Sequence, residues 1–172
     1  MDQKVLILNQ DYTALALCSI QKAFVLLFLE KAEMVHKSET SILRTINRNY
    51  PAPSIIRLQH YVHVPYKGIS LSRNNVMRRD KYQCLYCGST KNLTLDHLIP
   101  KSRGGNSSWN NLATACMRCN TKKGNRTPEE AGLILSKKPR RPTLTAFLAS
   151  HVNTLDQNWS LYLRVKESYR ED

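Results

Sequence analysis

The spacing of hydrophobic residues in the first third of the chain changes from strand-like to helix-like and back. Short apolar or alternating runs, which are typical of β-strands, occur in four segments: 4–8, 12–18, 32–37 and 53–65. Between the second and third runs, residues 19–32 place apolar side chains along a broad helical stripe, and Ser19 is a suitable N-cap. We therefore expect a mostly buried helix within a small α+β lobe over residues 1–70, where no motif indicates chemistry.

A second folding unit is predicted over residues 71–135, where the sequence becomes more polar and basic. Ser72 is a suitable cap for a short helix whose cations we expect to be exposed: Arg73, Arg78, Arg79 and Lys81. A β-hairpin is predicted by two apolar segments that flank a stretch rich in Gly, Ser and Asn: 93–100 and 111–116. A helix is predicted after Cys119 and a second short one from Pro128, so the hairpin is expected to pack on a helix.

The last part of the chain, residues 136–172, combines a basic linker with helical sequence. Residues 136–143 are basic and interrupted by proline, and they either follow a nucleic-acid groove or form a solvated connection. Beyond them, the apolar spacing predicts one or two helices. We expect Trp159, with Tyr162 and Leu163, to pack against the body of the protein, and we assign no chemistry to this tail.

The composition indicates a globular protein with a strongly positive charge. Hydrophobic residues make up 41% of the 172 residues, which argues against a disordered chain. The 26 Lys and Arg residues outnumber the 13 Asp and Glu residues and give a formal net charge of +13. This charge attracts polyanions, so nucleic acid is the expected partner. The alternative is a basic surface that only keeps the protein in solution.

The sequence indicates neither export nor a membrane span. Residues 1–12 lack the basic start and long apolar stretch of a secretory signal, so we expect the mature chain to begin there. The longest apolar run, residues 23–29, is far too short to cross a bilayer. We therefore expect a cytoplasmic protein, in which cysteines are metal ligands or core residues and not disulfides. Cys18, alone in an apolar segment, is expected to lie in the core.

Four of the five cysteines occur in two Cys-x-x-Cys pairs. Cys84 pairs with Cys87, and Cys116 pairs with Cys119. Two such turns supply the four thiolates of a closed tetrahedral zinc site. Because sulfur would fill all four coordination positions, water has no place on the ion, and we expect this zinc to be structural.

The residues between and around these pairs follow a longer pattern. Residues 84–126 contain, in order, C-x-x-C, D-H-x-x-P, G-G, N-N-L and C-x-x-C-N-x-x-K. This pattern resembles the HNH endonuclease family, with Asn120 where the third letter of the family name would place histidine. The resemblance implies an α+β protein with a ββα-metal core stapled by a zinc site of four cysteines. The N-terminal lobe is similar to the leader of small bacterial HNH proteins, and a helical C-terminal tail follows the core.

The insert between the cysteine pairs contains residue types that suit phosphodiester hydrolysis. This reaction needs an activated water, charge neutralisation at the phosphate and stabilisation of the departing oxygen. His97, whose ordinary pKa is near neutrality, suits the general base. Asp96 and the side-chain carbonyl of Asn120 are hard oxygen donors for Mg²⁺ or Mn²⁺. The family resemblance implies the same three roles, with one catalytic ion and products that carry 5′-phosphate and 3′-hydroxyl ends.

The neighbouring positions of Asp96 and His97 raise a geometric question. Adjacent side chains on a regular strand face opposite ways, so the two serve one site only if the strand twists, bends or ends between them. Pro100 favours a strand end nearby. The plainer interpretation of the dipeptide is an exposed aspartate beside a packed histidine.

Two further residues of the pattern have expected roles. The Asn111 amide can tie together the backbone on both sides of the long loop, and the family resemblance implies that it holds the histidine strand. An ordinary loop asparagine is the alternative, and Asn110 competes for the role. Lys123 lies three residues after Asn120, on the same helical face, and is expected to contact a phosphate near the cut.

Basic residues around the motif are the expected contacts to the nucleic-acid backbone: Arg78, Arg79, Lys101, Arg103, Lys122, Lys123 and Arg126. The sequence therefore predicts a divalent-metal-dependent DNA endonuclease that nicks or cleaves double-stranded DNA. A zinc-stapled nucleic-acid-binding module without catalysis is the alternative, and RNA is a further candidate substrate.

Overall fold

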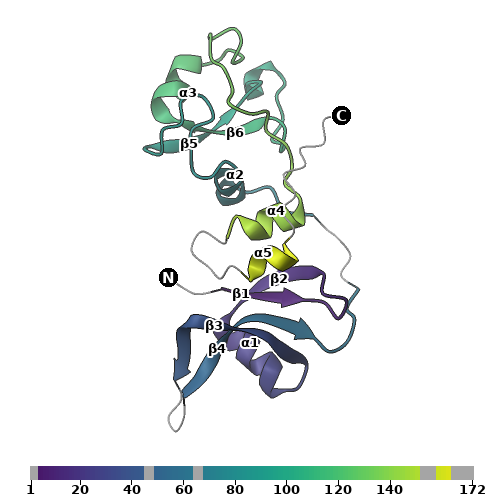
Figure 1. Cartoon of the computed structure of the whole chain (residues 1–172). Helices are drawn as coiled ribbons and strands as arrows, with labels where there is room; N and C mark the ends of the chain where they lie inside the picture. Colours follow the sequence, from purple (N-terminus) through teal and green to yellow (C-terminus); the bar gives the residue numbers. More distant parts are fainter. Residues whose placement is uncertain (1–3, 45–48, 64–67, 152–157, 164–172) are drawn as a thin grey trace. The chain divides into compact units, whose positions relative to one another are not determined.

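The computed structural model describes residues 4–44, 49–63, 68–151 and 158–163, and these residues form two compact units (Figure 1). The first unit combines the described residues up to 63 with those from 151 onward. The second unit is Gly68–Ser150. In the described ranges we find no helix with the length and apolar character that a membrane span requires.

The first unit is a sheet with one long helix. Over the described residues its four strands are ordered β2-β1-β4-β3, with β1 (Lys4–Leu8) central and parallel to β4 (Asn49–Leu58). At the edges, β2 (Ala14–Ser19) pairs antiparallel with β1, and β3 (Ala32–Arg44) pairs antiparallel with β4. Helix α1 (Ile20–Phe28) joins β2 to β3. The α+β lobe expected from the sequence is therefore present.

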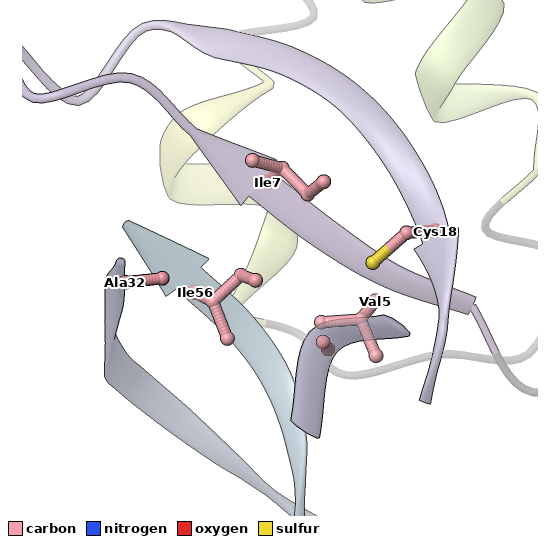
Figure 2. Close-up of a cluster of buried hydrophobic side chains, with 6 residues drawn as sticks. Val5, Ile7, Cys18, Ala32 and Ile56 are labelled. Atoms are coloured by element: carbon pink, nitrogen blue, oxygen red, sulfur yellow. The ribbon is translucent and has the colours of Figure 1, made fainter. Parts of the chain in front are cut away.

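The apolar core of this unit lies where α1 meets the sheet. Figure 2 shows buried side chains of the sheet that converge on one another, and the cluster contains Val5, Ile7, Cys18, Ala23, Ala32 and Ile56. Cys18 is thus a core residue, as its apolar surroundings predict. Burial of these side chains on one face fixes the register of the strands, because a shift by one residue would turn them outward.

Helix α1 begins where the sequence predicts but is less buried than expected. The Lys22 amide donates to Ser19 Oγ at 3.3 Å, which caps the helix. Among the helical residues, all of which the structure describes, Ala23 is buried, whereas Val25 and Phe28 are 52% and 79% exposed. The expectation of a mostly buried helix was wrong, because one sheet face covers only one side of the helix.

Strand β4 begins and ends earlier than the predicted segment 53–65. It starts at Asn49, since the long β3–β4 hairpin extends beyond the core, and it ends at Leu58. Beyond that end, the Asn9 side chain accepts from the Val62 amide at 2.9 Å and donates to the Val62 carbonyl at 3.0 Å. A side-chain amide thus replaces the strand partner there, which apolar periodicity does not reveal.

The described C-terminal residues pack in the first unit through an aromatic anchor. Helix α5 (Trp159–Tyr162) buries Trp159 completely, and its indole Nε1 donates to Ser54 Oγ at 2.8 Å. Leu163 is also buried, and the Tyr162 ring lies edge-on to His36. These contacts agree with the packing that the sequence predicts for this segment.

The second unit contains an antiparallel hairpin of β5 (Leu93–His97) and β6 (Leu112–Cys116) followed by helix α3 (Met117–Lys123). Helix α2 (Arg73–Arg79) precedes the hairpin, and Ser72 Oγ caps it by accepting from the Asn75 amide at 3.2 Å. This order of elements is the expected ββα core. A short 3₁₀ helix and helix α4 complete the unit's described helices, η1 (Lys101–Arg103) and α4 (Leu144–Ala149).

The boundaries after the hairpin differ from the prediction. Helix α3 starts at Met117, before Cys119, and ends at Lys123, because Gly124 adopts φ 56° and turns the chain away. Pro128 begins a turn and not a helix. That turn has reciprocal capping bonds, in which the Thr127 amide donates to Glu130 and the Glu130 amide donates to Thr127 Oγ1.

The basic segment 136–143 lies along the second unit. The Ser136 amide donates to the Leu85 carbonyl at 2.8 Å, and Lys137 Nζ donates to the Arg79 carbonyl at 3.1 Å. Farther on, Arg141 Nη2 donates to the Ile69 carbonyl at 3.4 Å. The segment is therefore held against the second unit at these points, although most of its residues, including Lys138 and Arg140, are exposed to solvent.

Candidate metal centre and active site

The two cysteine pairs meet at the base of the hairpin. Cys84 and Cys87 lie in the turns before β5, Cys116 ends β6, and Cys119 lies in α3. Their Sγ atoms all lie within 4.8 Å of one another, and those of Cys87 and Cys116 are 3.7 Å apart. Tetrahedral zinc with Zn–S bonds of about 2.3 Å places sulfurs about 3.8 Å apart, whereas a disulfide needs about 2.05 Å. The four sulfurs therefore fit one zinc ion.

The surroundings of these sulfurs shift the pKa values of the thiols in opposite directions. The Cys119 amide donates to Cys116 Sγ at 3.5 Å and, as the largest cause, lowers the pKa of the Cys116 thiol to about 7. Burial raises the pKa of Cys84. A zinc ion would supply the positive charge that keeps such buried thiolates ionised. Ala115 and the half-buried Leu93 pack against the sulfurs and join the metal centre to both strands.

Asp96 and His97 face different sides of β5. Asp96 pairs with Ala113 and is 4% exposed, whereas His97 pairs with Leu112 at the strand end and is half-buried. The plainer interpretation, an exposed aspartate beside a packed histidine, is wrong, because the aspartate is the buried member. The strand ends at His97, as the nearby Pro100 favours, so the imidazole turns toward the long loop.

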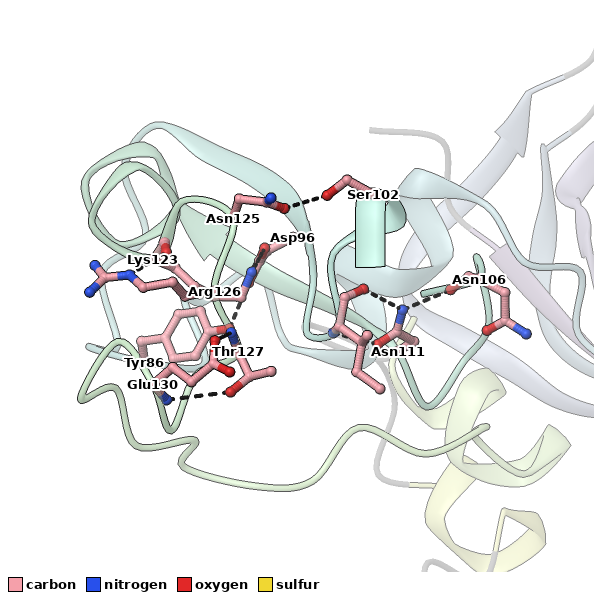
Figure 3. Close-up of polar contacts among 11 residues, drawn as sticks. Tyr86, Asp96, Ser102, Asn106, Asn111, Lys123, Asn125, Arg126, Thr127 and Glu130 are labelled. Carbon is pink, nitrogen blue, oxygen red and sulfur yellow. Dashed lines mark hydrogen bonds and ion pairs between the residues drawn. The ribbon is translucent and has the colours of Figure 1, made fainter. Parts of the chain in front are cut away.

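The Asp96 carboxylate is held on both oxygens. Oδ1 accepts from Lys123 Nζ at 2.8 Å, and Oδ2 accepts from the Tyr86 hydroxyl at 2.6 Å (Figure 3). Burial first, and then the neighbouring Asp96, raise the pKa of Tyr86 well above its ordinary value, so the phenol keeps its proton. Asn120 is half-buried on α3, the helix that also carries Lys123.

The His97 imidazole lies in a setting that favours its neutral form. Its Nε2 is 3.0 Å from Ser107 Oγ in the long loop. Burial is the largest cause that lowers the pKa of His97, the charges of Lys101 and Lys123 lower it further, and Asp96 opposes them. The neutral ring has a free lone pair for a proton, which is the form that a general base requires.

Asn111 braces the loop that faces His97. Its Oδ1 accepts from the Ile99 amide at 2.8 Å, and its Nδ2 donates to the carbonyls of Ile99 and Asn106 at 3.0 and 2.8 Å (Figure 3). The side chain therefore ties the residues after β5 to the loop before β6. Asn110, the competitor for this position, is exposed. Gly105 passes so close that a Cβ there would lie 1.8 Å from the Ile99 carbonyl oxygen.

Arg79 was expected on the surface and is instead 7% exposed in a buried ion pair with Asp80. Its Nε and Nη2 donate to the two oxygens of Asp80 at 2.9 and 2.8 Å. Its Nη1 and Nη2 also donate to the carbonyls of Trp109 and Leu112 at 2.7 and 2.8 Å. The Thr114 amide donates to Asp80 at 2.9 Å. Arg79 thus joins α2 to the segment that carries Asn111, and its cation does not face solvent.

The remaining basic residues differ in how free they are to meet a phosphate. Arg103 forms an exposed ion pair with Glu130, and Arg126 Nη2 donates to the Lys122 carbonyl at 2.7 Å. Lys123 is buried against Asp96. The others are exposed or half-buried: Arg78, Lys101 and Lys122.

Sequence reasoning missed three side chains at this site, Tyr86, Ser107 and Asp80. Tyr86 occupies an unspecified position of a Cys-x-x-Cys turn, and Ser107 is one of several loop residues with hydroxyl groups. Asp80 directly follows Arg79, so an ion pair between these neighbours was readable in principle. The local pattern carries no signal that distinguishes the other two from ordinary turn residues.

Two family models match the chain. One is described as HNH endonuclease-associated, N-terminal domain, and it matches residues 5–66. The other is described as HNH endonuclease, and it matches residues 84–135, which contain both cysteine pairs, the β5–β6 hairpin and α3. No curated protein matches the chain. Because the two matches together span most of the chain in the expected order, the protein belongs to the HNH endonuclease family.

Proposed function

We propose that this protein is a divalent-metal-dependent endonuclease that nicks or cleaves double-stranded DNA. The observation that carries the proposal is the half-buried His97 imidazole at the last residue of β5, held against Ser107 and one residue after the buried Asp96. The match to the HNH endonuclease model supports nuclease activity in general. The reaction would leave 5′-phosphate and 3′-hydroxyl ends.

In this proposal, His97 is the general base. Its imidazole accepts a proton from the attacking water, and Ser107 Oγ, 3.0 Å from Nε2, orients the ring. Asn111 is a positioning residue, because its bonds to Ile99 and Asn106 fix the loop that faces the imidazole. A water that enters from the exposed side of His97 meets a base already held in place.

A hard divalent ion, Mg²⁺ or Mn²⁺, would be held by Asp96 and Asn120. The fit rests on donor chemistry, since carboxylate and amide oxygens suit such ions, and on the fact that Asp96 already holds a cation, the Lys123 ammonium. When bound, the ion supplies charge stabilisation at the scissile phosphate and the departing 3′ oxygen. A zinc ion held by the four cysteines would have a purely structural role.

The charge of the chain supports DNA as the substrate. The formal net charge is +13, and exposed or half-buried cations in the second unit include Arg78, Lys101 and Lys122. These side chains would attract the phosphate backbone without reading sequence. A cytoplasmic location agrees with cysteines that are all free of disulfides.

Incubation of supercoiled plasmid with the protein separates an enzyme from a non-catalytic binding module. We expect open-circular or linear DNA with Mg²⁺ or Mn²⁺ and intact plasmid with EDTA. End-labelling with polynucleotide kinase should require prior phosphatase treatment, because the 5′ ends already carry phosphate. Plasmid that stays supercoiled at every ion concentration, while the protein binds it, would instead favour the binding module.

A further inference from the structure

Lys123 is a fully buried cation with a specific partner. Its side chain is 1% exposed, the Asp96 side chain is 4% exposed, and the two form an ion pair at 2.8 Å. Lysine is rarely buried to this extent, because removing an ammonium group from water is costly unless a carboxylate compensates for it. The pair therefore neutralises Asp96 inside the protein. The sequence predicts that Lys123 contacts a phosphate, whereas in the structure its ammonium is bound to Asp96.

The Asp96 carboxylate has a partner on each oxygen. Lys123 Nζ donates to Oδ1, and the Tyr86 hydroxyl donates to Oδ2 (Figure 3). A divalent ion would need to approach one of these oxygens to about 2.1 Å. At that distance it would compete directly with the ammonium for the carboxylate, and the two positive charges would repel each other in a poorly screened environment.

The two partners of Asp96 differ in whether they conflict with an ion. Tyr86 donates through an uncharged hydroxyl at 2.6 Å, so it can stay beside a metal-bound carboxylate. Lys123 carries a charge, and it is the last residue of α3, followed by Gly124 with φ 56°. Its long side chain can therefore move without unwinding the body of the helix.

We propose that a divalent ion binds Asp96 only in exchange for the Lys123 ammonium, which makes Lys123 a determinant of ion affinity. This inference rests on the proposed function, in which Asp96 is an ion ligand. Without the ion, Lys123 neutralises the carboxylate and holds α3 against β5. With the ion, the Lys123 side chain leaves the interior, and its amine becomes accessible to reagents in the solvent.

Chemical labelling of lysines in the wild-type protein tests the exchange without any mutation. The zinc-loaded full chain is treated with an amine-acetylating reagent, with and without Mn²⁺, and labelling rates are read for each lysine by mass spectrometry. We expect Lys123 to be protected without Mn²⁺ and to become several-fold more reactive as Mn²⁺ is added. Two internal controls should not change: exposed Lys122, and Lys137, which is bound to the Arg79 carbonyl. A Lys123 that stays protected at saturating Mn²⁺ would overturn the proposal.

Direct measurement of Mn²⁺ affinity by electron paramagnetic resonance gives a second test. Lys123→Met removes the competing cation and keeps an apolar stem, so it should bind Mn²⁺ about tenfold or more tightly than the wild type. The matched variant Lys122→Met should bind like the wild type, and Asp96→Asn should abolish this binding. Zinc content and circular dichroism report whether each variant is folded. If Lys123→Met does not fold, the labelling test on the wild type decides whether the ion exchanges with Lys123.

The outcomes separate the exchange from the proposed function. Mn²⁺ binding that requires Asp96 but is equal or weaker in Lys123→Met would refute the exchange and leave the endonuclease proposal intact. Plasmid cleavage that persists in Asp96→Asn would refute the role of Asp96 as an ion ligand, and with it the exchange.

Discussion

Replacing Arg79 by methionine tests the buried network that supports the candidate site. The substitution leaves Asp80, whose side chain is 0% exposed, without its bidentate partner, and it removes the donors to the Trp109 and Leu112 carbonyls. Breaking a buried ion pair by removing one partner costs about 3–5 kcal/mol. Since each 1.4 kcal/mol is a factor of ten, amide protection in β6 should fall by about 10²-fold to 4 × 10³-fold.

Hydrogen exchange read by mass spectrometry measures this loss in the second unit alone. The informative peptides cover β6, where the Thr114 amide donates to Asp80. The matched control is Arg78→Met, at the half-buried neighbouring position, which should change the free energy of opening by less than about 0.5 kcal/mol. If Arg79→Met left β6 protection unchanged and weakened DNA binding instead, Arg79 would not stabilise β6 through the buried network. It would then be a phosphate contact.

Three further variants test other parts of the site. Cys116→Ser should release zinc, unfold residues from about 84 to 126 and abolish cleavage, because the small ββα core depends on the metal. Circular dichroism measures the unfolding, and a zinc-free variant that stays folded and active would contradict this prediction. Asn120→Ala should weaken Mn²⁺ binding and cleavage yet keep zinc, and its purification without zinc would show that the two metal sites are not separate. Gly105→Ala should distort the loop, because its Cβ would lie 1.8 Å from the Ile99 carbonyl oxygen, and wild-type cleavage and stability would contradict that close approach.

Local signals in the sequence were enough to predict most of the elements. The near-continuous apolar run at residues 4–8 is β1, and the serines before both early helices, Ser19 and Ser72, accept the capping hydrogen bonds. The two Cys-x-x-Cys pairs bring their sulfurs together, and their short spacing lets both sulfurs of a pair reach one ion. Features that depend on a few neighbouring residues could therefore be predicted from the sequence.

The pairings that define the site could not be predicted, because they join residues far apart in sequence. Lys123 and Asp96 are 27 residues apart, and Arg79 reaches a carbonyl 33 residues away at Leu112. An exposed and a buried cation have the same local sequence, so Arg79 and Lys123 were both expected on the surface or at a phosphate. The exposure of Phe28 has the same origin, since helical periodicity does not show how much of a helix a sheet covers.

The central claim is that His97 is the general base of a DNA-cleaving enzyme, and single-turnover cleavage of one duplex by wild type and His97→Ala tests it most directly. Both proteins carry zinc, and binding to the same duplex is measured in parallel, with His60→Ala, an exposed histidine of the first unit, as the control. We predict that His97→Ala lowers the cleavage rate by about 10²–10⁴-fold while its DNA affinity stays close to that of the wild type. Equal cleavage rates for His97→Ala and the wild type would contradict the assignment.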